Sequence, residues 1–444
     1  MIMKNKLQKI LTKIRLPKFV VDVASLFSGR IVMTVLEIAI GILVARILGP
    51  EKKGILTTAM VIPVLVISFT DLGLGSTITH MMGKKLFNDQ ALFSSMTLFI
   101  LITSVLGIIG AFLAYIITGF QERYGWMIVI ISIMIIPARM VMTFVNGVWM
   151  AQNRIPRLAI VNIIPDIIYF IGVISLVIFG IFQVELILLS QTLSVIITAV
   201  YVLMLVHKYG NLKPQYISEL FWKMVKKGMI YALTAFVMGL TYTVDIVILE
   251  RLTNATEVGV YSAGVAVASL LLWLPSVINT VNFSHSASSS DSTVYARKTA
   301  AILRVSLCAA LLPVFLLFIL APYVIPLVYG EAYSASVAVV QAILPGIWSV
   351  LVFKVLYGDL AGRGRPETAL LVFSLAALID IGLNIWWDPS FGAIGSAWAS
   401  TISYIIGGIF LGIRYAKLSN LTLRELFIIR RDDIKPLFRL IGKI

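Results

Sequence analysis

The sequence predicts an all-α integral membrane protein with about twelve transmembrane helices in two six-helix lobes, a parallel internal repeat around a central cavity. Three observations lead to this class. The composition is more apolar than that of a soluble domain, long apolar runs recur along the whole chain, and the two halves of the chain resemble each other at offsets near 205 and 210 residues.

The composition argues against a soluble fold. Of the 444 residues, 59% are hydrophobic and 13% are charged, whereas soluble domains average about 45–50% apolar and about 25% charged residues. A soluble protein of this length would lack the polar residues needed to cover its surface. The single cysteine, Cys308, lies in an apolar run and allows no disulfide within the chain.

The expected spans follow from the apolar runs, because a membrane-crossing helix needs about 20 mostly apolar residues. The runs are continuous rather than alternating, which favours helices over a closed β-barrel. The expected spans lie near residues 20–48, 55–82, 91–118, 126–150, 158–180, 184–206, 228–250, 257–281, 300–328, 335–361, 367–387 and 391–415.

The chain is expected to divide into five parts. These are a cytoplasmic basic amphipathic N-terminus, an N-terminal six-helix lobe, a cytoplasmic linker, a C-terminal six-helix lobe and a cytoplasmic basic tail, at residues 1–19, 20–206, 207–227, 228–415 and 416–444. In 4–19 and 421–444, basic residues are interspersed with apolar ones. Both segments are therefore expected to lie on anionic membrane lipids.

The basic residues predict the orientation. With this span count, 27 lysines and arginines fall on the side of the two termini and five fall on the other side. The positive-inside rule then places both termini in the cytoplasm and the chain in the cytoplasmic membrane as a multi-pass protein. The net charge of +15 is scattered over short loops of one face, which argues against nucleic acid as a partner.

Two pairs of segments indicate the internal repeat. "AQNRIPRLAIV" (151–161) resembles "AGRGRPETALLV" (361–372), and each is a basic loop that opens a new span. "VARILGPEKKGIL" (44–56) resembles "LERLTNATEVGVY" (249–261), with a glycine near the end of each loop. An offset of six spans preserves orientation, so the repeats are parallel. This architecture is found in transporters that bind their substrate between two lobes.

Charged residues inside the expected spans are the main functional signal. A charge at the centre of a spanning helix costs about 2.5–3.5 kcal/mol, so such a group faces water or a partner rather than lipid. Arg30 and Glu37 share a helix face but lie about 10 Å apart along the axis, so each needs a partner on another helix. Charges near span ends, such as Arg304 and Asp359, can reach the interface and carry less weight.

The candidate site combines cations with carboxylates. Cations suit a phosphate, and mixed donors and acceptors suit sugar hydroxyls. For each residue, a structural ion pair inside the membrane is an alternative of equal weight. The expected substrate-binding residues are Arg30, Glu37, Asp71, Arg139 and Lys354, and the candidate for cation coupling is Asp245.

The sequence lacks the common motifs of nucleotide binding and metal catalysis. It contains no G-x-x-x-x-G-K-[ST] motif, and its three histidines are not clustered with other metal ligands. No catalytic residue, metal or cofactor is therefore expected, and the chain is not expected to be an enzyme. Transport would draw on an ion gradient, the membrane potential or the supply of substrate.

Two regions carry a family resemblance. "ARILGPEKKGI" (45–55), followed by "DLGLGSTITHMMGKK" (71–85), resembles the first two spans of the polysaccharide-biosynthesis, O-antigen-type flippases. These belong to the multidrug/oligosaccharidyl-lipid/polysaccharide exporter superfamily. "PLVYGEAYSASVAVVQAILPGIW" (326–348) resembles the outer loop and tenth span in the second half of the same family.

The resemblance implies a function and a set of partners. Such a flippase moves an oligosaccharide linked to undecaprenyl diphosphate across the cytoplasmic membrane by alternating access, for cell-surface polysaccharide synthesis. Anionic membrane lipids and other polysaccharide assembly proteins are the further partners expected. Two alternatives remain. A cation-coupled multidrug exporter of the same superfamily would have an aromatic-lined pocket. A membrane glycosyltransferase or polymerase would need catalytic carboxylates or a large outer loop, and the expected outer loops are short.

Overall fold

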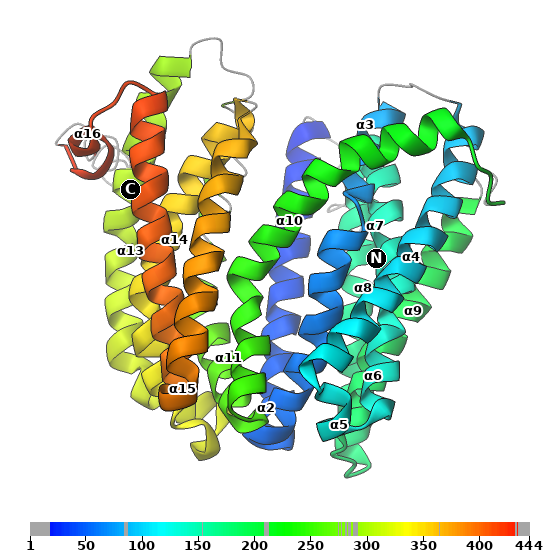
Figure 1. Ribbon diagram of the computed structural model, residues 1–444, viewed down its shortest axis with the longest axis horizontal. Helices are drawn as coiled ribbons and strands as arrows, with labels where there is room; N and C mark the ends of the chain where they lie inside the picture. The colour runs from blue at the N-terminus through cyan, green and yellow to red at the C-terminus, as the bar shows by residue number, and fades with distance from the viewer. Residues whose placement is uncertain are drawn as a thin grey trace, which may run out of the picture. The chain divides into compact units, whose positions relative to one another are not determined.

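The described part of the protein contains helices and connecting turns but no strand. The computed structural model describes residues 18–83, 88–152, 154–207, 213–273, 292–363 and 365–430, with the single residues 275, 276, 278, 279, 282, 286 and 433. Its helices are α2 (Lys18–Thr70), α3 (Leu74–Gly83), α4 (Asp89–Thr118), α5 (Phe120–Tyr124), α6 (Trp126–Ile133), α7 (Ile135–Ala151), α8 (Ile155–Ile178), α9 (Val184–Val206), α10 (Ser218–Leu252), α11 (Ala255–Ser269), η2 (Leu270–Leu272), α13 (Ser292–Tyr329), η3 (Glu331–Tyr333), α14 (Ser336–Gly362), α15 (Pro366–Leu418) and α16 (Leu423–Phe427) (Figure 1).

Some expected segments lie wholly or partly outside the described residues. Of the predicted amphipathic N-terminus (1–19), only residues 18 and 19 are described, at the start of α2. The predicted linker (207–227) is described except for 208–212. The predicted tail (416–444) is described as far as 430 and at 433.

The predicted spans fall on described helices, except that residues 274, 277, 280 and 281 of the predicted eighth span (257–281) lie outside the described residues. Nine helices of the described part are long and apolar enough to cross a membrane. Of these, α15 contains the predicted eleventh and twelfth spans, and α2 contains the first span and most of the second, which continues in α3. α10 covers the predicted seventh span at 228–250. The prediction of an all-α, multi-pass membrane protein is therefore confirmed.

Glycines break the two longest helices where the sequence predicts the end of a span. Gly49 has φ 71° and ψ 175°, a conformation that favours glycine, and Pro50 after it lacks a backbone N–H. Gly392, three residues after Pro389, has φ 54° and ψ −137°. These positions separate the first predicted span from the second, and the eleventh from the twelfth.

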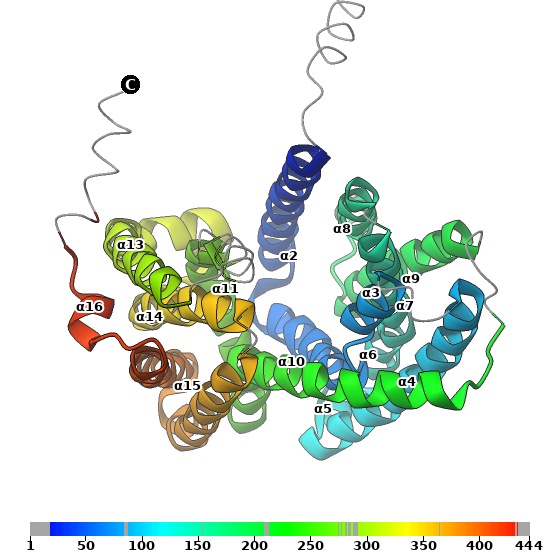
Figure 2. The same cartoon turned by 90° about the horizontal axis from the view of Figure 1, so that it is seen from above.

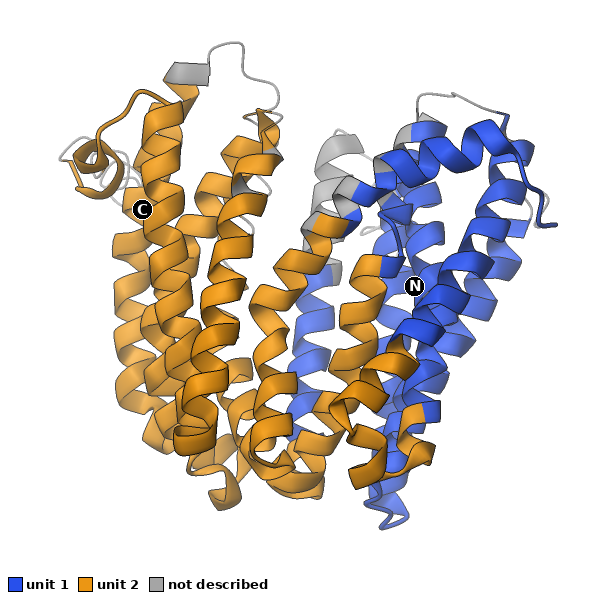
Figure 3. Ribbon diagram, viewed as in Figure 1, with its two compact units in different colours: residues 1–44, 70–110, 130–232 blue, residues 45–69, 111–129, 233–444 orange. Residues whose placement is uncertain are grey.

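The chain forms two compact units that do not follow the chain order. Unit 1 comprises residues 1–44, 70–110 and 130–232, and unit 2 comprises residues 45–69, 111–129 and 233–444 (Figure 3). The predicted lobe boundaries and the predicted central cavity stay predictions, and each unit is described by itself.

Unit 1 is held together by close helix packing. α3 packs on α7, and α9 packs on both α7 and α8 (Figures 1 and 2). A Cβ atom on Gly147 of α7 would lie 2.6 Å from the backbone oxygen of Gly75 in α3. Glycine therefore lets these two helices approach at backbone distance, as small residues do in membrane proteins.

Unit 2 is centred on α14, which packs between α13 and α15. The rings of Phe353 and Phe373 stack with centroids 5.0 Å apart inside an apolar core that these helices share. The earlier segments of unit 2 are tied to its later helices by polar contacts. Arg46 donates hydrogen bonds to the carbonyl oxygens of Leu327 and Val328 near the end of α13, and Arg123 forms a 2.8 Å ion pair with the buried Glu250 of α10.

The repeat predicted from the sequence has a direct counterpart inside unit 2. A Cβ atom on Gly54 would lie 1.7 Å from the backbone oxygen of Ala255, and a Cβ atom on Gly259 would lie 1.9 Å from that of Pro50. These are the glycines that the sequence repeat aligns, and the two contacts are equivalent under the same alignment. A reciprocal contact of this kind is what a two-fold relation between repeats produces.

Candidate functional site

Three buried aspartates of unit 2 form what we call the acidic cluster: Asp245, Asp380 and Asp388. Asp245 lies on α10 and is 2% exposed, while the other two lie on α15 and are fully buried. Asp380 and Asp388 each interact electrostatically with Asp245. The structure thus places the predicted coupling residue beside two further carboxylates from a distant part of the chain.

Hydroxyl groups surround Asp245. Tyr261 of α11 donates a hydrogen bond to the Oδ2 atom of Asp245, and Ser400 of α15 donates another at 3.3 Å. The backbone N–H of Ile246 donates to Oδ1 at 2.8 Å. The position of Asp245 is therefore fixed by neutral donors from three helices.

The α15 side of the cluster retains acceptors without donors. Asp380, Asn384 and Asp388 are four residues apart and share one helix face. Ser403 donates a 3.3 Å hydrogen bond to one carboxylate oxygen of Asp380. Ser396 donates a 2.8 Å hydrogen bond to one carboxylate oxygen of Asp388. The second carboxylate oxygen of each aspartate, and the Oδ1 atom of Asn384, are buried and accept no hydrogen bond from the described residues.

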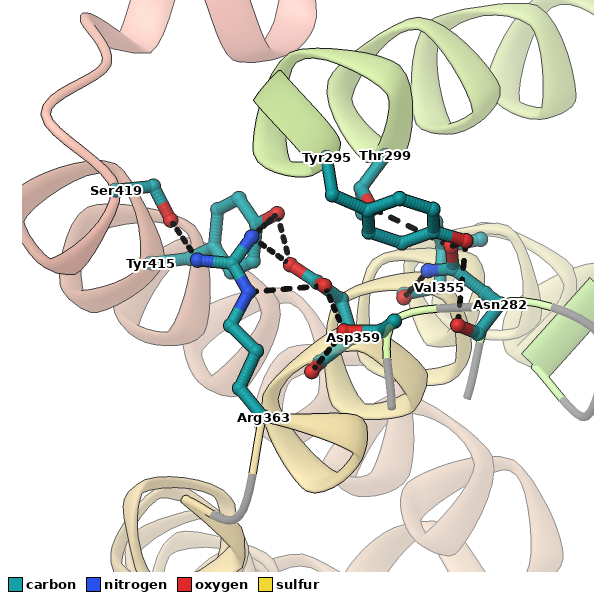
Figure 4. Close-up of polar contacts among 9 residues, drawn as sticks. Asn282, Tyr295, Thr299, Val355, Asp359, Arg363, Tyr415 and Ser419 are labelled. Atoms are coloured by element: carbon teal, nitrogen blue, oxygen red, sulfur yellow. Dashed lines mark hydrogen bonds and ion pairs between the residues drawn. The ribbon is translucent and has the colours of Figure 1, made fainter. Parts of the chain in front are cut away.

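Another buried carboxylate of unit 2 shows what the acidic cluster lacks. Asp359 of α14 is fully buried, forms an ion pair with Arg363 one turn later and accepts a 2.5 Å hydrogen bond from Tyr415 (Figure 4). Asn282 continues this network, donating to the carbonyl oxygen of Val355 at 2.8 Å. Asp359, which was given less functional weight as a charge near a span end, is therefore neutralised inside the protein by Arg363.

The acidic cluster suits the binding of a positive charge. Among the described residues, the ion pairs do not include Asp245, Asp380 or Asp388. Burial of an ionised carboxylate without a partner costs several kcal/mol. No group of three or more His, Cys, Asp or Glu side chains in the described part is placed to hold a metal ion. A proton or a monovalent cation, held by a carboxylate and neighbouring hydroxyls, fits this arrangement.

A second set of charges lies in unit 1, and we call it the mixed-charge group: Arg30 and Glu37 of α2, Arg139 of α7 and Asp166 of α8. Asp166 interacts electrostatically with the other three, and Arg139 interacts with both carboxylates. Arg139 and Asp166 therefore lie within electrostatic range of the α2 charges, and the expectation that Arg30 and Glu37 each have a partner on another helix stays a prediction.

The mixed-charge group remains open to its surroundings. Arg30, Glu37 and Arg139 are exposed, and none of the four residues forms a direct ion pair with a described residue. One carboxylate oxygen of Asp166 is buried and accepts no hydrogen bond from the described residues. Two guanidinium groups and two carboxylates are thus available to a polar ligand in helices that are otherwise apolar.

Asp71 has a local structural contact. It lies in the turn between α2 and α3, where its carboxylate accepts a 2.9 Å hydrogen bond from the backbone N–H of Gly73. Gly73 and Leu72 both have positive φ angles, and an aspartate that accepts from the backbone two residues later stabilises such a turn. The structure does not bring Asp71 into the mixed-charge group.

Lys354 of α14 lies in unit 2, close to the acidic cluster. Its Nζ atom is 5.8 Å from the centre of the Tyr242 ring, and Tyr242 in turn lies 5.9 Å from Tyr404, centroid to centroid. Tyr242 precedes Asp245 by one helical turn of α10. The aromatic rings therefore separate this cation from the carboxylates, and no described carboxylate forms an ion pair with it.

Several residues of both groups were not in the predicted site. Asp166, Asn384, Asp388, Ser396 and Ser400 come from helices whose pairing the sequence does not reveal. One signal was present, because the spacing of Asp380, Asn384 and Asp388 places three polar side chains on one face of an apolar helix.

The fold and its charges define a class of protein. A multi-pass membrane protein with charged side chains inside its spanning helices is typical of transporters. A family model described as polysaccharide biosynthesis protein matches residues 19–284, more than half of the chain. The chain therefore belongs to the polysaccharide biosynthesis protein family.

Solved structures of transporters share this fold. A lipid II flippase MurJ in an inward closed conformation matches with a TM-score of 0.76 and 15% identity, over 96% of this chain and 93% of that chain. An inward-facing multidrug resistance MATE family transporter of the MOP superfamily matches with a TM-score of 0.68 and 13% identity, over 87% of this chain and 96% of that chain. A MOP superfamily transporter from Pyrococcus furiosus has a TM-score of 0.63 and 14% identity, over 89% and 94%. A comparison with curated proteins found no match.

Proposed function

We propose that the protein is a flippase that moves a polyprenyl-diphosphate-linked oligosaccharide across the cytoplasmic membrane for cell-surface polysaccharide synthesis. The observation that carries the proposal is the mixed-charge group, which is exposed on membrane-spanning helices of unit 1. Membership of the polysaccharide biosynthesis protein family supports it, and so does the fold shared with a lipid II flippase. In this role the protein transports its ligand and does not catalyse a chemical reaction.

The chemistry of the substrate matches the group. A sugar hydroxyl that enters hydrocarbon without a partner loses several kcal/mol of hydrogen bonding. The guanidinium groups of Arg30 and Arg139 donate two hydrogen bonds each to a phosphate, while Glu37 and Asp166 accept from hydroxyls. The polyprenyl tail remains in the lipid while these side chains bind the diphosphate and the sugars.

Alternating access requires a contact that closes one face and can open again. The contact between Gly54 and Gly259 lies beside loops that the sequence places outside the cell. It joins backbone to backbone, so it separates without leaving a charge unpaired. The break at Gly49 provides a hinge position in the same segment.

The acidic cluster is the proposed site of energy coupling. Asp245, Asp380 and Asp388 repel one another while ionised and unpaired, so a proton or monovalent cation binds there with a gain in free energy. Uptake on one face and release on the other would bias the conformational cycle. Lys354 and Asp71 stay proposals as substrate ligands outside the two groups.

The orientation and partners follow from the charge distribution. The 27 to five asymmetry of basic residues places both termini in the cytoplasm. The basic segments at the two ends of the chain are then next to anionic lipids of the inner leaflet. Other polysaccharide assembly proteins would supply the lipid-linked oligosaccharide and receive it after transport.

Reconstituted vesicles test the proposed substrate. The purified protein is placed in liposomes that contain a fluorescent oligosaccharide on undecaprenyl diphosphate, and an impermeant quencher reports the fraction in the outer leaflet. We expect that fraction to change faster than in protein-free vesicles. Equal rates with and without protein, in vesicles that contain correctly inserted protein, would refute the flippase.

A multidrug exporter is the second candidate, supported by the fold shared with MATE family transporters. Both candidates use the acidic cluster, so the substrate must separate them. The same vesicles, loaded with a cationic dye and given a sodium or proton gradient, would show dye export only if this second candidate is right.

A further inference from the structure

Unit 2 also contains a basic site, which is separate from the acidic cluster and from the mixed-charge group of unit 1. A cavity of about 220 Å³ lies where the first turns of α13 meet the segment that follows α15. We call it the arginine pocket, and it is lined by Arg297, Ala300, Arg304, Leu421, Glu425 and Arg430. Arg297 and Arg304 are seven residues apart on α13 and share one helix face.

Hydrogen bonds and an ion pair hold the wall of this pocket in place. Arg304 donates two 2.7 Å hydrogen bonds to the carboxylate of Asp433 and another to the backbone oxygen of Glu425. The side chains of Arg304 and Asp433 are each 6% exposed. Thr422 and Glu425 form a capping box that starts α16. Arg304 therefore anchors residues 422–430 and Asp433.

The other two arginines keep donors for a ligand. Arg297 is exposed and has no ion pair with a described residue. Arg430 is 53% exposed and forms a single 3.3 Å ion pair with Glu425. Three guanidinium groups face two carboxylates, Glu425 and Asp433, so the pocket has a net positive charge.

Exposed apolar side chains lie on the same segment as the arginine pocket. Leu423, Phe427, Ile428 and Ile429 are 47%, 37%, 57% and 38% exposed on the same segment that carries Arg430. α13 itself is a candidate membrane span from Val294 onward. An apolar surface next to arginines at the end of a spanning helix is the arrangement that meets lipid headgroups.

We propose that the arginine pocket binds the phosphate group of an anionic membrane lipid, with Arg297 and Arg430 as its ligands and Arg304 as the residue that positions the wall. Guanidinium groups bind phosphate oxygens through paired hydrogen bonds. The exposed apolar side chains of 423–429 contact the acyl chains of the same lipid. The lipid would thereby join α13 to the segment after α15.

Lipid binding by charge-matched variants tests the proposal. The full-length protein in zwitterionic micelles is titrated with fluorescent phosphatidylglycerol or phosphatidylcholine, with inorganic phosphate as a competitor. Arg297→Gln combined with Arg430→Gln removes the two ligands. Lys298→Gln combined with Arg424→Gln removes the same charge from two exposed neighbours that do not line the pocket.

We expect the wild type to prefer phosphatidylglycerol. The pocket variant should weaken that binding by on the order of tenfold, and the control variant by about twofold or less. Equal losses in the two variants, or no preference between the lipids, would overturn the proposal. Inorganic phosphate should compete only weakly, and binding of phosphate alone as tight as that of the lipid would refute a lipid ligand.

Discussion

At the residue scale, two kinds of buried carboxylate occur in unit 2. Asp359 is neutralised by Arg363 and hydrogen bonded to Tyr415, whereas Asp380 and Asp388 each retain a buried oxygen without a described donor. A paired charge contributes to stability mainly because its partner would otherwise be left unpaired. An unpaired charge is tolerated where it binds something during function.

Substitution of the two kinds of buried carboxylate should affect the free energy of unfolding differently. Asp359→Asn leaves Arg363 without its partner and should lower the free energy of unfolding by about 3–5 kcal/mol. Asp388→Asn removes an unpaired charge and should leave stability unchanged or higher, while it abolishes the dependence of transport on the ion gradient. Thermal unfolding in detergent and gradient-driven transport in vesicles measure the two effects, and gradient-dependent transport by Asp388→Asn would exclude a coupling role.

At the element scale, the contact between residues 50–54 and 255–259 depends on the absence of side chains. Valine at position 54 would place its Cβ atom 1.7 Å from the Ala255 oxygen, so the two segments must separate. Gly41 of the same helix has nothing within 4 Å of its Cβ position and provides a matched control.

We expect Gly54→Val to open this contact. In a Cys308→Ser background, the substitution Ala255→Cys introduces a single cysteine at this buried position. Its reaction with an impermeant maleimide measures how accessible the position is. Labelling should increase severalfold with Gly54→Val and stay at its original level with Gly41→Val. If Gly54→Val left labelling unchanged, the contact would not be a closing surface.

The segment after α15 should be released by acid. Hydrogen bonds from Arg304 and the backbone N–H of Arg430 lower the pKa of Asp433 below its ordinary value, which is about 3.9. A carboxyl group with a lower pKa when docked stabilises docking above the ordinary pKa, and this contribution is lost as the pH falls through the docked value. The backbone N–H of Thr422 lowers the pKa of Glu425 as well, so both groups act in the same direction.

Hydrogen exchange of amides in 422–430 measures this release. Protection should persist from neutral pH to about pH 5 and fall below about pH 4. Asp433→Asn should lose most of the protection already at neutral pH. Retained protection in that variant would show that Asp433 does not anchor the segment.

At the scale of the whole molecule, the sequence predicted the helices well because their causes are local. Long apolar runs determined the predicted spans, and two of the predicted boundaries lie close to the breaks that the structure shows at Gly49 and Gly392. The glycines at 54 and 259, which the repeat aligns, lie in contact in the structure, although the alignment by itself did not predict that contact.

The site was harder to predict because it depends on tertiary contacts. Ser400 reaches Asp245 from 155 residues away along the chain, and nothing local distinguishes it from other serines of apolar helices. The sequence also did not reveal which of the charged residues are neutralised by an ion pair. Arg304 and Asp359 were given less weight because they lie near span ends, but the sequence did not reveal that they form ion pairs with Asp433 and Arg363 inside the protein.

The central claim is that the mixed-charge group of unit 1 carries a lipid-linked oligosaccharide, and the most direct measurement is the flipping rate of charge-neutral variants. In vesicles with equal amounts of inserted protein, Arg30→Gln and Arg139→Gln should each slow transport by at least about tenfold, the effect of one charge-assisted hydrogen bond. The control Lys417→Gln, at an exposed position near the end of α15, should flip at the wild-type rate. Wild-type rates in both arginine variants would contradict the account.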